Sequence, residues 1–154
     1  MRYDRLDMHL KLVISAAACA AILALSTLSA PAATVGGGVF TGGGNGQNAT
    51  GAAVLAGTNA GIPLIPVSVG VTGFAALAQN GGYAVTLDGA LAFKADAVGV
   101  GYGVGKFGNA AAGGTVTAFF DHGLAPFTTL ELRGYKTTAA SGGTAGFIGL
   151  KFSL

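Results

Sequence analysis

Large apolar and small or polar residues alternate along most of the chain beyond residue 33. This is the pattern of β-strands whose two faces meet different surroundings. In 82–94, Tyr83, Val85 and Leu87 lie on one face, and the other face carries Ala, Thr and Asp88. In 98–107, valine and tyrosine alternate with glycine. Both segments are predicted to be strands with one bulky and one small face.

Six further segments bring the predicted number of strands to about eight. Alternation is clear in 67–72, 127–138 and 148–154, and weaker in 34–41, 50–57 and 114–122. Asn80-Gly81-Gly82 is a strong hairpin signal between two of them. Abundant glycine and the absence of helix caps argue against helices. We therefore predict an all-β fold of about eight antiparallel strands, without a domain boundary.

The first 32 residues have the layout of a secretory signal peptide. Arg2, Arg5 and Lys11 precede a charge-free apolar stretch, 12–28, which is followed by Ser29-Ala30-Pro31-Ala32-Ala33. A positive segment, an apolar segment and a small-residue site are what export signals require. We predict cleavage after Ala32, so that 1–32 is the signal peptide and 33–154 the β-barrel domain. The alternative is an uncleaved anchor, because the apolar stretch is at the low edge of what spans a bilayer.

Charge is scarce, and this bears on what surrounds the strands. Only 9% of the 154 residues are charged, and nine charges lie in 33–154. Soluble domains have about 25%. A membrane barrel removes this difficulty, because its bulky face meets lipid and its small face lines a narrow lumen. Two alternatives are a secreted glycine-rich β protein that assembles into a surface layer or fibre, and a soluble periplasmic β-barrel that binds an apolar ligand with its bulky face inward.

The export signal, the amphipathic strands and the alternating last strand resemble the small, eight-stranded, OmpA-like outer-membrane β-barrel proteins. The resemblance covers roughly 34–154. It implies a closed antiparallel up-and-down barrel in outer-membrane lipid. It also implies that the outer-membrane assembly machinery reads the last strand through Ile148, Leu150 and Phe152. Leu154 stands where that family usually ends in Phe or Trp.

Topology and loop length narrow the expected role. Such barrels keep both chain ends in the periplasm, which places the connections 42–48, 78–82, 108–113 and 139–144 outside and 57–62, 94–97 and 121–126 inside. The outer connections are short, rich in glycine and alanine and poor in aromatic residues, which argues against an adhesin. We therefore predict a structural or passive porin-like barrel of the cell envelope, with at most a very narrow pore.

Two groups of side chains are candidates for specific roles. Charged residues on the small faces are expected to pair inside the lumen, because both signs are present; they are Asp88, Glu131, Arg133 and Lys151. Aromatic residues near strand ends are expected to form girdles at the membrane interfaces; they are Tyr83, Phe93, Tyr102, Phe107, Phe127 and Phe152.

No segment carries a convincing catalytic, cofactor or metal site. The G-x-G-x-x-G match at 103–108 precedes a turn and a strand, where a dinucleotide site needs a helix. Asp121 and His122 are strand neighbours, so their side chains point to opposite faces. His122 is the only histidine beyond residue 32, which leaves no metal-ligand set. We expect no enzyme activity and no cofactor, and the net charge of +2 gives no argument for a nucleic-acid partner.

Overall fold

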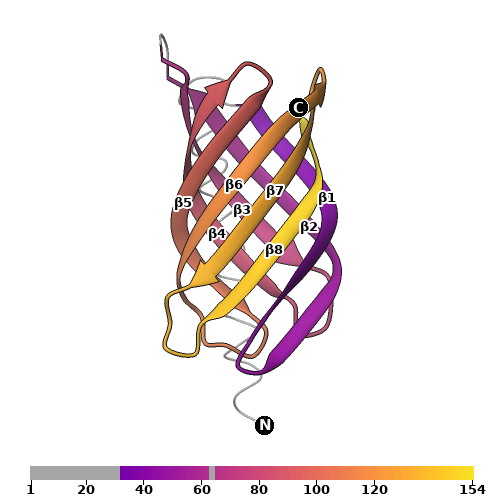
Figure 1. Cartoon of the computed structure of the whole chain (residues 1–154), viewed down its shortest axis with the longest axis vertical. Helices are drawn as coiled ribbons and strands as arrows, with labels where there is room; N and C mark the ends of the chain where they lie inside the picture. Colours follow the sequence, from indigo (N-terminus) through magenta and orange to yellow (C-terminus); the bar gives the residue numbers. More distant parts are fainter. Residues whose placement is uncertain (1–31, 63–64) are drawn as a thin grey trace.

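The computed structural model describes residues 32–62 and 65–154, which form one closed β-barrel (Figure 1). Each strand pairs antiparallel with the next, and β8 closes onto β1. The predicted fold class and the number of strands are confirmed. The strands are β1 (Ala32–Gly44), β2 (Gln47–Gly61), β3 (Val67–Ala76), β4 (Gly82–Phe93), β5 (Asp96–Phe107), β6 (Gly113–Ala125), β7 (Thr128–Thr137) and β8 (Gly143–Ser153).

Two predictions concern a membrane-spanning or exported segment. Within the described ranges, no helix is long and apolar enough to cross a bilayer. The predicted signal peptide, 1–32, lies outside the described residues except for Ala32, the first residue of β1.

The first hairpin is longer and tighter than its sequence predicted. β1 and β2 continue to a two-residue turn at Asn45-Gly46, whereas the whole of 42–48 was expected to be a connection. Both turn residues have positive φ, 55° and 78°. This is the Asn-Gly geometry whose twist matches that of a β-hairpin. The glycines of 42–44 therefore belong to a strand of the barrel wall.

The prediction of a connection at 121–126 was wrong. β6 runs on to Ala125, with an irregular register between Gly123 and Ala125. A bulge allows a strand to bend and continue past an extra residue. The turn falls at Pro126-Phe127, where Phe127 has a φ of 65°. β2 likewise extends to Gly61, through most of the predicted connection 57–62.

The barrel has two different ends. The hairpin end carries the connections 45–46, 77–81, 108–112 and 138–142. The terminal end carries the start of β1, the C-terminus and the β2–β3, β4–β5 and β6–β7 connections. The C-terminus marks the terminal end at the top of Figure 1. Connections at the hairpin end are slightly longer, as they are on the outward side of small membrane barrels.

The bulky face of the strands points away from the lumen. On β5, Val100 and Tyr102 are 67% and 61% exposed, and the glycines between the large residues face inward. This orientation is the reverse of what a soluble barrel with an internal apolar ligand needs. Closure of the sheet also pairs every strand on both sides, which removes the free edges that fibre assembly uses.

Candidate functional site: the barrel lumen

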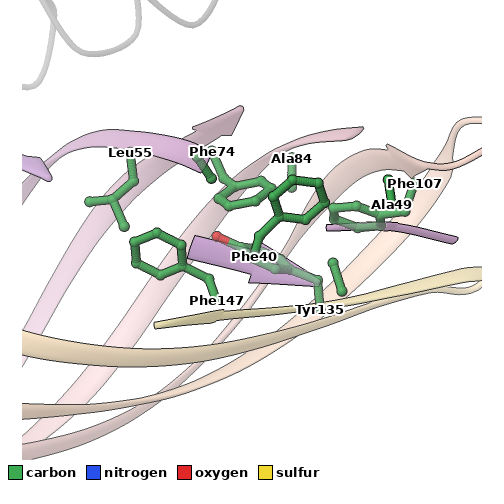
Figure 2. Packing of buried hydrophobic residues seen from close by; sticks show 10 residues of the cluster. Phe40, Ala49, Leu55, Phe74, Ala84, Phe107, Tyr135 and Phe147 are labelled. Atoms are coloured by element: carbon green, nitrogen blue, oxygen red, sulfur yellow. The ribbon is translucent and has the colours of Figure 1, made fainter. Parts of the chain in front are cut away.

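A layer of aromatic rings fills the lumen next to the hairpin end (Figure 2). Phe74 on β3 is its centre, with ring centroids at 5.0 Å from Tyr135, 5.8 Å from Phe147, and 6.2 Å from Phe40 and Phe107. All five side chains are at most 4% exposed. Edge-on and tilted ring pairs of this kind pack favourably at such distances. These packed aromatic side chains therefore block the lumen.

Phe107 was predicted to belong to an interfacial girdle, and this was wrong. Its side chain is fully buried in the aromatic layer. Along β5 it shares the inward face with Gly103 and Gly105, whereas Tyr102 and Val104 point outward. The sequence already indicated the inward direction of Phe107, because this residue lies an even number of positions after Gly103 and Gly105 and so points to the same face of the strand.

The β5–β6 connection folds over the mouth of the barrel at the hairpin end. The Gly108 N–H donates a hydrogen bond to the Gly81 carbonyl at 2.7 Å, and the Ala111 N–H donates to Ser141 Oγ at 3.2 Å. Gly108 has a φ of +59°, and a Cβ there would lie 2.6 Å from the Gly44 nitrogen. Only glycine fits this position. The last glycine of the G-x-G-x-x-G match thus allows the connection to pack closely against β1.

An ionic layer lies on the other side of the aromatic rings, toward the terminal end. The Arg133 side chain lies at its centre: Nη1 donates to Asp88 Oδ2 at 2.7 Å, and Nε donates to Glu131. Lys151 Nζ lies 2.8 Å from Glu131 Oε2 and donates to Asp121 Oδ2 at 2.5 Å. These contacts link side chains from β4, β6, β7 and β8 across the lumen.

The four charged residues singled out from the sequence therefore lie in one connected set of ion pairs. Sequence reasoning missed Asp121, which opposes Glu131 across β6 and β7. It also missed Phe119, whose ring centroid is 4.1 Å from the Arg133 guanidinium carbon. Both residues lie at positions of β6 whose side chains alternate toward the lumen, and this alternation could have identified them from the sequence. His122 points outward from β6, with Nδ1 2.6 Å from Asp96 Oδ1.

The ionic layer contains three carboxylates and two cationic side chains, so its formal charge is negative when all are ionised. Arg133 and Glu131 are almost completely buried. Asp88 Oδ2 also accepts a hydrogen bond from Thr72 Oγ1 at 2.8 Å. A Cβ on Gly101 would collide with Asp88 Oδ1, which explains why this inward position is glycine. Buried charges of this kind are stable only as a set, because each loses its hydration.

A cavity of about 230 Å³ adjoins the ionic layer, and all eight strands contribute to its lining. It reaches Asn59 and Ala92, which are exposed near the terminal end. The aromatic layer lies between this cavity and the hairpin end. The lumen is therefore a polar vestibule closed on one side. In the part of the chain that the structure describes, no group of three or more His, Cys, Asp or Glu side chains is placed to hold a metal ion.

Solved structures share this architecture. Neisserial surface protein A (NspA) superposes with a TM-score of 0.52 at 10% identity, covering 80% of this chain and 97% of that one. Ail of Yersinia pestis gives a TM-score of 0.49 at 10% identity, and a de novo designed transmembrane β-barrel gives 0.48 at 14%; each covers 80% of this chain, and 97% and 95% of its own. No family model and no curated protein sequence matches the chain. The predicted resemblance to small outer-membrane β-barrel proteins is confirmed at the level of the fold.

Proposed function

We propose that the mature chain is a closed, non-enzymatic outer-membrane barrel with a passive structural role. The observation that carries the proposal is the outward bulky face, combined with a lumen blocked by the aromatic layer. A lipid environment accepts apolar side chains on the outside of a barrel. Closure satisfies the backbone hydrogen bonds, which lipid requires.

The distribution of outward polar and aromatic residues supports this location. Lys106 and Lys136 lie within two residues of a strand end, and the His122–Asp96 pair lies near the terminal end. A charge on the lipid face costs about 2–4 kcal/mol at the bilayer midplane and close to nothing at the interface. Large exposed side chains are available as interfacial anchors near the terminal end; they are Phe93, Phe127 and Phe152.

The aromatic layer and the cap formed by 108–112 support a closed barrel over a conducting one. Any solute entering the vestibule from the terminal end meets Phe74 and its neighbours before it reaches the other side. A narrow eight-stranded barrel has little interior beyond what its side chains fill. The proposed role is therefore to occupy and organise the membrane, without a continuous path for solutes.

The proposal predicts how the purified protein will behave. Residues 33–154 should require detergent or lipid to remain dispersed, and should fold there to a β-rich circular dichroism spectrum. The folded barrel should migrate differently on a gel before and after boiling, because a closed barrel resists unfolding by detergent at room temperature. A protein that is monomeric in plain buffer and shows no such shift would contradict the membrane location.

We also propose that the assembly machinery reads the outward face of β8. Ile148, Leu150, Phe152 and Leu154 point outward in alternation and are 40–78% exposed. Phe152→Ser should lower the fraction assembled in outer membranes of cells, yet leave refolding into detergent nearly unchanged, since Phe152 lies outside the lumen. The matched control is Leu87→Ser on β4, which is equally outward. Equal assembly defects for both variants would show that β8 has no special role.

A further inference from the structure

The outer wall formed by β1, β6, β7 and β8 contains a groove floored by small residues. Gly134 on β7 pairs with Gly146 on β8 and with Ala118 on β6, and Gly146 pairs with Thr41 on β1. A Cβ on Gly134 or Gly146 would meet nothing nearer than 4.0 Å, so the space outside both is open. Two hollows, of about 650 and 770 Å³, meet at Ala118 and Gly134.

The sides of this groove are apolar. Bulky side chains from five strands border its floor: Val39, Val100, Val116, Phe120, Leu132 and Ile148. A flexible hydrocarbon chain fills a groove of this shape well, because each added atom gains contacts that an open hollow lacks.

One end of the groove is polar and positively charged. Tyr102 and Lys136 line the hollow nearer the hairpin end. A Cβ on Gly114 would lie 2.5 Å from the Tyr102 hydroxyl and 2.8 Å from Thr138 Oγ1. Both hydroxyl groups therefore lie close to the outward side of this glycine. Lys136 lies on the same outward face of β7, two residues before Thr138, and has no ion-pair partner among the described residues. An ammonium group and two hydroxyls therefore gather where the apolar groove begins.

We infer that this groove binds one phosphate-bearing lipid, with its headgroup at Lys136 and Tyr102 and an acyl chain along Gly134 and Gly146. The inference rests on the proposed membrane location. A cationic side chain near the membrane surface attracts anionic lipid. The acidic residues of the described chain lie in the lumen or, for Asp96, at the terminal end, so none opposes a phosphate here.

A second copy of the chain fits this groove less well than a lipid. A two-fold dimer in a membrane has its axis along the membrane normal, so the two copies of each residue lie at the same depth. A dimer whose axis passes through this groove would bring the two Lys136 side chains together at that depth, and like charges repel each other. A phosphate group removes that conflict and neutralises the charge.

The test is native mass spectrometry of the folded chain in detergent, titrated with phosphatidylglycerol or with zwitterionic phosphatidylcholine. The wild-type protein should retain one phosphatidylglycerol in preference to phosphatidylcholine. Lys136→Gln should lower that retention about fivefold, and Gly134→Val should abolish it by filling the groove. The matched controls, Lys106→Gln on β5 and Gly73→Val on β3 across the barrel, should retain lipid as the wild type does.

Three outcomes would overturn the inference. Equal retention of the two lipids would show that the site does not recognise an anionic headgroup. Equal losses in Lys136→Gln and Lys106→Gln would show a general charge effect without a site. Dimers that Gly134→Val converts to monomers would identify the groove as a protein interface. The heat-dependent gel shift is measured first for each variant. Loss of the shift means that the barrel has failed to fold, which would count against the proposed function. A variant that keeps the shift but loses the lipid has failed only to bind lipid.

Discussion

Arg133→Met is expected to destabilise the folded barrel by about 3–5 kcal/mol, the cost of removing one partner from a buried set of charges. The guanidinium is the shared cation of Asp88 and Glu131, and it also packs on the Phe119 ring. Without it, the lumen keeps three carboxylates and only the Lys151 ammonium. Urea unfolding in lipid vesicles, followed by circular dichroism, measures the loss as a lowered midpoint.

The double variant Asp88→Asn/Arg133→Met provides the internal control for this prediction. It removes one charge of each sign, so the formal charge of the lumen returns to that of the wild type. The double variant should therefore be more stable than Arg133→Met alone, and its loss should be smaller than the sum of the two single losses. Lys106→Met, on the outer face, should change stability little. Additive losses would show that the lumen charges do not act as a unit.

Alternation of side chains predicted the parts of this molecule that depend on one strand at a time. Asp88 shares a face with Ala84 and Thr86, so its inward direction follows from the sequence of β4 alone. The same parity places Glu131 and Arg133 together on β7. Because side chains in a strand repeat every two residues, this prediction is secure wherever one large outward residue fixes the register.

What the sequence did not predict depends on several strands or on turn geometry. The aromatic layer brings together residues from five strands: Phe40, Phe74, Phe107, Tyr135 and Phe147. No local pattern states that these side chains lie at the same height in a closed barrel. The Gly108 contact with Gly44 is a similar case, since it joins β1 to the β5–β6 connection. Both features follow from strand stagger, which a single sequence does not reveal.

Phe74→Ala is expected to make the barrel, which we propose to be closed, pass small ions. Phe74 is the only ring whose centroid lies within 6.2 Å of the four others, so its loss leaves a void in the middle of the layer. The substitution should also cost about 3–5 kcal/mol of stability. In planar lipid bilayers, the wild type should show no discrete current steps and the variant should show small ones. Leu87→Ala, which removes an outward side chain, should remain silent.

Shortening the 108–112 connection separates the two barriers at the hairpin end. The cap contains only glycine, asparagine and alanine, and its contacts to Gly81 and Ser141 are single hydrogen bonds. The rings form a packed apolar layer between the vestibule and the hairpin end. A variant with the cap reduced to Asn-Gly should therefore stay closed, and should increase the current only when combined with Phe74→Ala. Current steps from the cap variant alone, as large as those of the combination, would mean that the connection, and not the aromatic layer, closes the barrel.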